Sequence, residues 1–163
     1  MVVIADTSPL NYLVLIRQIE LLPRLFTQVF VPDAVIEELG RPETPAEVTR
    51  WAASTPGWVR HLVSLPIESD PSLDRLGMGE RAAILFAKSL RPDVLLVLDE
   101  AKGRRAATER QIPVIGILGI LDIASEQKWI SLPDVLSELQ RTSFRAAPGL
   151  ITSLLDRNRR RNA

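Results

Sequence analysis

The 163-residue chain contains no cysteine and only one histidine, His61. The absence of cysteine excludes disulfides, thiolate metal sites and cysteine nucleophiles. A single histidine argues against a zinc site or a histidine-based catalytic triad, and any bound metal would need oxygen ligands, as Mg²⁺ and Mn²⁺ usually have. His61 falls in a predicted strand with no partner pattern around it, so we expect it to be a packing or surface residue.

The chain also has no excess charge of either sign. Twenty Lys and Arg residues balance 20 Asp and Glu residues, which gives a formal net charge of zero. Nucleic acid would therefore have to bind at a local basic patch rather than in a general positive field. Candidates for such a patch are Lys102, Arg104, Arg105, Arg110 and the basic stretch 157–161. Aromatic residues make up only 5% of the chain, and we expect no base stacking.

Long hydrophobic runs are absent as well. The apolar run 10–16 is far shorter than the ~20 residues that a spanning helix needs. Met1 leads into a strand with neither a basic region nor a small-residue cleavage site, so we expect no secretory signal and a cytoplasmic protein. The length, together with a mean hydropathy of +0.10, predicts one soluble domain over 1–155. We expect the basic tail over 156–163 to be disordered and solvated.

Short apolar runs rich in β-branched residues alternate along the chain with apolar residues at helical spacing. The runs predict strands over 2–5, 29–31, 58–65, 94–98 and 114–117. The spacing predicts helices over 9–16, 19–26, 33–39, 46–54, 77–90, 102–110, 118–128, 133–141 and 148–155, with a loop over 69–76. This alternation predicts right-handed βαβ units, and hence an α/β fold whose parallel sheet is covered by helices on both faces.

Two of the predicted strands end in a carboxylate. Asp6 follows the first strand and Asp99 follows the fourth. We expect Thr7 or Ser8 to cap the next helix, with Pro9 in its first turn. Asp6 alone could be a simple turn former. The carboxyl ends of parallel strands share one edge of the sheet, however, and ligands of open α/β folds bind at that edge.

Two glutamates on predicted helices can reach the same edge. Glu38 borders the apolar side of its helix, whereas Glu37 points more to solvent; Glu80 lies in a first turn, where the helix dipole alone would explain it. Three or four carboxylates that converge without Lys or Arg at their centre raise one another's pKa unless a divalent cation holds them. We therefore predict a metal site, which could bind a phosphodiester and activate water for its hydrolysis.

Four stretches in order resemble a PIN domain: 2–8, 32–39, 76–84, and 96–100 with Arg104 and Ala107. The stretch 114–121 is similar to the DUF3368 subgroup of PIN-like, VapC-type toxins. The resemblance covers about 2–155. It implies a three-layer α/β/α fold with a central, mainly parallel sheet, and an Mg²⁺- or Mn²⁺-dependent ribonuclease. It also implies the toxin role in a toxin–antitoxin pair, with an antitoxin protein as partner and a homodimeric state.

The resemblance also implies roles for single residues. The family's four catalytic acids are matched in order by Asp6, Glu38, Glu80 and Asp99. The hydroxyl that assists at the metal edge is matched by Thr7 or Ser8. Relatives often carry a second Asp where this chain has Glu100, which leaves open whether Glu100 touches the metal directly or through water. The expected metal ligands are Asp6, Glu80, Asp99 and Glu100.

The basic residues after the fourth strand have two readings. Arg104 matches a basic family position that would contact phosphate or pair with an acid, and Lys102 and Arg105 are further candidates for RNA contacts.

A catalytically weak module that binds a partner protein through its acids is the alternative to a nuclease. A phosphohydrolase of the haloacid dehalogenase type ranks lowest, because it needs a second Asp where this chain has Ser8.

Overall fold

A computed structural model describes residues 1–64 and 68–163. Its centre is a five-stranded, all-parallel sheet with the order β3-β2-β1-β4-β5. The strands are β1 Val2–Ala5, β2 Val29–Pro32, β3 Val59–Leu62, β4 Val94–Val97 and β5 Val114–Ile115. The predicted parallel α/β sheet is confirmed. The third strand is shorter than the predicted 58–65, and position 65 lies outside the described residues.

Helices connect and cover these strands. They are α1 Thr7–Leu15, α2 Leu21–Phe26, α3 Asp33–Leu39, α4 Ala46–Ala53, α5 Met78–Ser89, α6 Ala101–Glu109, α7 Ile117–Glu126, α8 Leu132–Gln140 and α9 Leu150–Asn162, with a short 3₁₀ turn, η1, at Pro71–Leu73. The predicted helices all have counterparts whose ends differ by at most two residues, except that α9 extends to Asn162 instead of 155. Across residues 1–64 and 68–163, no helix combines the length and the apolar character that crossing a membrane requires.

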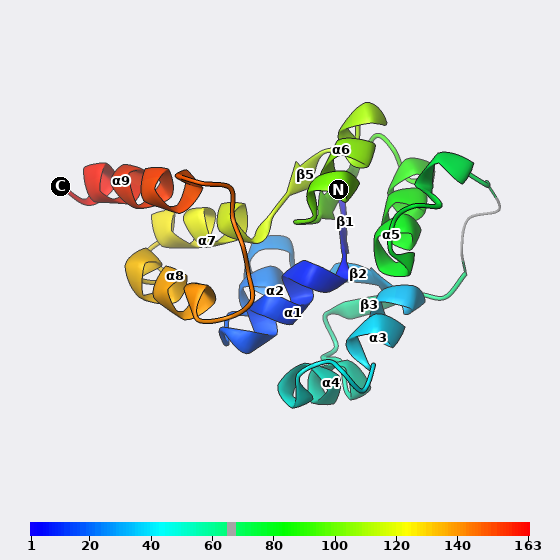
Figure 1. The fold of residues 1–163 in the computed structure, drawn as a ribbon, viewed down its shortest axis with the longest axis horizontal. Helices are drawn as coiled ribbons and strands as arrows, with labels where there is room; N and C mark the ends of the chain where they lie inside the picture. Colours follow the sequence, from blue (N-terminus) through cyan, green and yellow to red (C-terminus); the bar gives the residue numbers. More distant parts are fainter. Residues whose placement is uncertain (65–67) are drawn as a thin grey trace.

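Alternate residues of β1, β2 and β4 pack into two separate hydrophobic cores. The helices that cover these cores lie on both sides of the sheet (Figure 1). Val3 and Ala5 of β1 point into the core formed with α1, α2 and α7, on which α8 and α9 form an outer layer. Ile4 points to the opposite face, into the core formed with α5 and α6. Both faces of the sheet are thus buried, as the continuous apolar runs predict for a parallel sheet. The three-layer α/β/α arrangement follows.

The register of the central strands determines where the acids lie. Ala5 of β1 is opposite Val97 of β4, and the N–H of Asp6 donates to the Val97 carbonyl at 3.0 Å. The chain therefore leaves both strands at the same edge of the sheet. This places Asp6 beside the segment 98–100, as the strand pattern predicts.

Three local predictions are wrong. Neither Thr7 nor Ser8 caps α1, because Asp6 is itself the N-cap residue, without a side-chain cap bond, and both hydroxyl residues lie inside the first turn. The last strand stops at Ile115 rather than 117, because Gly116 is the extended N-cap residue and α7 begins at Ile117.

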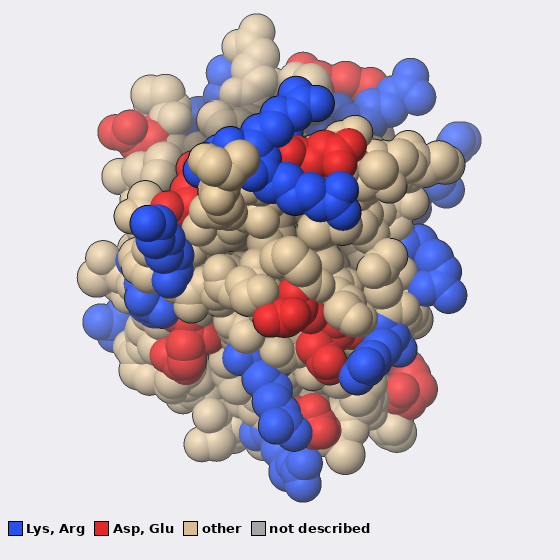
Figure 2. Space-filling model, turned by 90° about the vertical axis from the view of Figure 1, so that its left-hand side faces the viewer, with Lys and Arg blue, Asp and Glu red and all other residues tan. Residues whose placement is uncertain are grey.

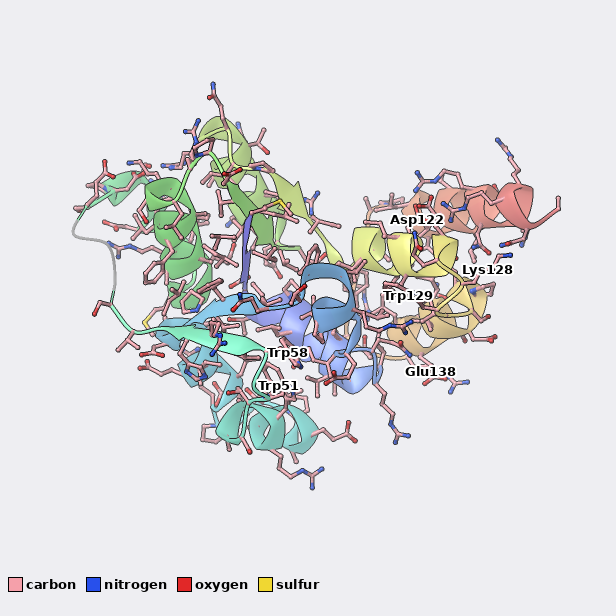
Figure 3. The ribbon with its side chains drawn as sticks, turned by 180° about the vertical axis from the view of Figure 1, so that it is seen from behind. Trp51, Trp58, Asp122, Lys128, Trp129 and Glu138 are labelled. Carbon is pink, nitrogen blue, oxygen red and sulfur yellow. The ribbon has the colours of Figure 1, made fainter. Side chains whose placement is uncertain are left out.

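The basic tail is the third. Helix α9 continues through it to Asn162, and Asn158 is buried with its Nδ2 donating to Ser125 Oγ at 2.6 Å. Figure 3 shows why the tail is ordered: the labelled Asp122 of α7 lies alongside α9. The Asp122 carboxylate pairs there with Arg157 at 3.3 Å and with Arg161.

His61 is a surface residue, as predicted, beside Thr55 and Asp33.

Candidate active site

Asp6 is the most buried acid at the carboxyl edge of the sheet. Its residue is only 2% exposed, and its Oδ1 has no hydrogen-bond partner among the described residues. Burial raises its pKa to about 7, with further contributions from neighbouring glutamates, although the Thr7 backbone partly opposes the shift. A buried carboxylate oxygen without a donor is unfavourable by itself. Asp6 is therefore held in place for something other than stability.

Glu38 of α3 points toward the sheet edge, as predicted, while Glu37 on the same helix is exposed. The Glu38 carboxylate accepts two hydrogen bonds, from Thr7 Oγ1 at 2.5 Å and from the Gly79 N–H at 2.8 Å. These bonds fix the carboxylate between α1 and α5. The Thr7 hydroxyl, expected to cap a helix, instead orients an acid.

Glu80 in the first turn of α5 joins the same cluster. Its Oε2 is buried without a hydrogen-bond partner among the described residues. Burial raises the pKa of Glu80, and the nearby charges of Glu100 and Glu38 raise it further. The backbone of α6 comes so close that a Cβ at Gly103 would overlap the Glu80 carboxylate. The Glu80 side chain is thus packed between α5 and α6 rather than exposed to solvent.

Gly79 is a residue of the site that sequence reasoning assigned only to tight helix entry. A Cβ there would lie 2.6 Å from Thr7 Oγ1, 2.7 Å from Glu38 Oε2 and 3.1 Å from Asp6 Oδ1. No side chain fits in that space. The signal in the sequence was the pair of glycines directly before Glu80, which lets the α5 backbone approach three polar side chains.

The adjacent acids Asp99 and Glu100 have different surroundings. The Asp99 carboxylate accepts from the Ile117 N–H at 3.1 and 3.3 Å, at the start of α7. Burial raises its pKa to about 6, although the Ile117 bond and the nearby Arg104 guanidinium oppose the shift. The charge of Glu100 raises the pKa of Asp6 and of Glu80. Its charge also raises the pKa of Asp99, and the Glu100 side chain itself is exposed, so both Glu100 and Asp99 lie at the border of the cluster formed by Asp6, Glu38 and Glu80.

A family model described as DUF3368, PIN domain, matches residues 2–160. The chain belongs to this family. The match confirms the resemblance seen in the sequence and covers both cores and the acid cluster. PIN domains are in general nucleases, and they usually use divalent metal ions. No curated protein and no solved structure matches the chain.

The acids at the sheet edge of this PIN domain do not form a complete metal site in the part of the chain that the structure describes. In residues 1–64 and 68–163, no three Asp, Glu or His side chains are grouped closely enough to hold an ion as they stand. Two acids explain this: Glu38 is bound to Thr7 and Gly79, and Asp99 to Ile117. The partnerless oxygens of Asp6 and Glu80 still fit a cation, because an oxygen-ligated ion such as Mg²⁺ would replace the missing donors.

The three basic residues predicted for RNA contacts lie in different places on the PIN domain. Arg104 Nη1 donates to the Leu98 carbonyl at 2.9 Å and lies against Asp99. Lys102 is exposed, and its charge partly offsets the rise in the pKa of Glu80. Arg105 points away and pairs with Glu109 of the same helix at 3.4 Å. Only Lys102 and Arg104 are close to the acids.

Proposed function

We propose that this PIN domain is a metal-dependent endoribonuclease that hydrolyses cytoplasmic RNA, and that it is the toxin of a VapBC-type pair. One observation carries the catalytic part: Asp6 and Glu80 each keep a buried carboxylate oxygen without a partner, at the edge of the sheet where β1 and β4 end. Nothing in fold stability explains two such oxygens on acids whose charges influence each other. An RNA substrate, an antitoxin partner and a homodimer belong to the same proposal.

Each residue of the acid cluster and its surroundings has a separate role in this proposal. Asp6 and Glu80 would hold Mg²⁺ or Mn²⁺, with Glu100 and Asp99 beside them. The ion, when bound, supplies a Lewis acid for the phosphate and a lowered pKa for the attacking water. The Thr7 hydroxyl and the Gly79 N–H keep Glu38 oriented toward this edge. Lys102 and Arg104 provide positive charge for phosphate next to the acids.

Cleavage of a labelled, structured RNA tests the proposal. Purified protein is incubated with Mn²⁺, with Mg²⁺ or with EDTA, beside the variants Asp6→Asn and Glu80→Gln. We expect cleavage with metal only, reduced at least ~100-fold in both variants, because each removes an ionised ligand. Glu37→Gln is the matched control, since Glu37 is exposed on the same helix as Glu38 and should retain full activity.

A second measurement separates this proposal from its alternative. Titration calorimetry with Mn²⁺ should show binding to the wild type that Asp6→Asn weakens. Absence of both cleavage on a panel of RNAs and Mn²⁺ binding would overturn the nuclease. The protein would then be a module that uses its acids to bind basic residues of a partner protein.

A further inference from the structure

A cleft of about 940 Å³ opens beside the acid cluster. Asp99 and Glu100 line it on the side of the acids, and it extends between α1, the start of α7 and the connection from α8 to α9. Its volume is at the top of the ~300–1,000 Å³ range of small-molecule pockets, so it can hold a segment of a polymer.

The charges of the cleft change sign away from the acids. Three arginines line it: Arg104, Arg145 and Arg157. Arg157 is paired with Asp122 of α7. Within the described chain, no ion pair includes Arg104 or Arg145, whose guanidinium groups donate only to backbone carbonyls. Arg145 has no acid partner among the described residues, and Arg104 lies near Asp99 without forming an ion pair. Positive charge at two points of one cleft favours an anionic ligand with more than one negative charge.

The cleft also contains a fixed aromatic pair. The rings of Tyr12 and Phe144 meet edge to face, with centroids 5.3 Å apart and an interplanar angle of 82°. The Tyr12 hydroxyl and Ser143 Oγ lie 3.0 Å apart and share a hydrogen bond, which ties α1 to the α8–α9 connection. Phe144 packs partly on the core and lines the cleft with the rest of its surface. Rings held in this way can support a flat base.

We propose that this cleft binds single-stranded RNA next to the phosphodiester that is cut, with Arg104 and Arg145 on its phosphates and one base against the Tyr12–Phe144 pair. The inference rests on the proposed nuclease function and deepens it. Single-stranded RNA is favoured over a duplex because only an unpaired base can leave its stack to contact a side chain. The expectation from composition that no base stacks on this protein is revised, because the fold brings two rings far apart in sequence into one cleft.

Binding is measured apart from cleavage, on Asp6→Asn protein with a fluorescein-labelled single-stranded RNA, and with DNA of the same sequence as a second arm. Arg145→Gln should weaken RNA binding ~3- to 10-fold at low salt. It should also reduce the slope of log K against log salt by about 0.7, the value for one phosphate contact on a single strand. Arg50→Gln, on exposed surface of α4 far from the cleft, is the charge-matched control and should change neither quantity.

The aromatic pair is tested by Phe144→Leu, which should weaken binding about tenfold without changing the salt slope. Phe144→Tyr should restore most of the affinity, because it keeps a flat ring at the same place. Thermal unfolding of each variant separates a lost contact from a disturbed fold. Equal affinity of Phe144→Leu and Phe144→Tyr would show that packing, and not stacking, is the role of the ring, and would overturn the base contact.

The outcomes also separate this inference from the proposed function. RNA binding that depends on Arg145, with neither cleavage nor Mn²⁺ binding, would support the cleft as an RNA site and overturn the nuclease. Cleavage by a protein whose RNA affinity is unchanged in Arg145→Gln and in Phe144→Leu would support the nuclease and overturn the cleft. No RNA binding at all, or tight binding of a basic peptide instead of RNA, would overturn the cleft assignment as well.

Discussion

Acids occur in two regions of this molecule with opposite surroundings. At the interface of α7 and α9, Asp122 and Glu126 face arginines: Arg157 and Arg161 pair with Asp122, and Arg161 also pairs with Glu126. The surface at this end of the molecule is a mixture of positive and negative side chains (Figure 2). At the edge of the sheet, by contrast, Asp6 and Glu80 each keep a carboxylate oxygen without a donor. The paired acids hold helices together, whereas the unpaired acids lower stability, as the proposed function requires of residues kept for a ligand.

The largest expected effect comes from removing the most buried charge. In metal-free buffer at pH 8, Asp6→Asn should raise the free energy of unfolding, by at most about 4 kcal/mol. The pKa of Asp6 rises from 3.8 to about 7 on folding, and each pKa unit corresponds to ~1.4 kcal/mol. Between these pH values the folded protein keeps a proton that the unfolded chain has released, so wild-type stability falls as pH rises and levels off above about 7. Urea denaturation in EDTA measures both quantities.

The controls for Asp6 use pH and metal. At pH 4 the difference between Asp6→Asn and wild type should largely disappear, because the folded wild type is then protonated. Mn²⁺ at pH 8 should stabilise the wild type and not the variant. Lower stability of Asp6→Asn than of wild type in EDTA at pH 8 would show that the ionised Asp6 carboxylate has its hydrogen-bond partners in the fold. It would contradict the contrast between unpaired and paired acids.

A smaller effect is expected from filling the space between the acids. Gly79→Ala should destabilise the protein by about 1–3 kcal/mol, the usual range for overpacking, because the new methyl would meet Thr7, Glu38 and Asp6. It should also reduce activity by moving the Glu38 carboxylate. Gly57→Ala is the matched control, since nothing lies within 4 Å of its added Cβ. Equal unfolding midpoints for the two variants would rule out a tightly packed site.

The smallest effect is expected at the paired acids. Asp122→Asn should destabilise the protein by only about 1 kcal/mol, because pairs with largely exposed Arg157 gain little over solvent. The loss should shrink in high salt, which already screens these pairs. RNA cleavage should be unchanged. A loss of several kcal/mol would place the α7–α9 interface on a par with the buried core and weaken the contrast with the acid cluster.

Local patterns in the sequence were sufficient to predict most of the sheet and the placement of Asp6 and Glu38 at its carboxyl edge. The β-branched runs before Asp6 and Asp99 predicted two strands that end at one edge, and the apolar side of α3 predicted that Glu38 points inward. These predictions depend only on short-range periodicity. They succeed because a parallel sheet buried on both faces leaves few other arrangements.

The remaining features depend on contacts between distant residues. The position of the Asp99 carboxylate is fixed by the Ile117 N–H, which lies at the start of α7 and donates to it from 18 residues further along the chain. The order of the basic tail is decided in the same way, by acids of α7 that lie more than 30 residues earlier. No pattern within the tail itself contains that information.

The pairing of β1 with β4 also determines when the acid cluster can form during folding. Val2 pairs with Val94, so the edge of β1 that faces β4 stays unpaired until the segment near residue 94 has docked. Pairings so distant in sequence carry a large loop-closure cost and slow folding. We therefore expect β1, β2 and β3 to associate early, with Asp6 still facing solvent and carrying its ordinary acidity. Its unusual pKa would then arise in the late, rate-limiting step in which β4 docks.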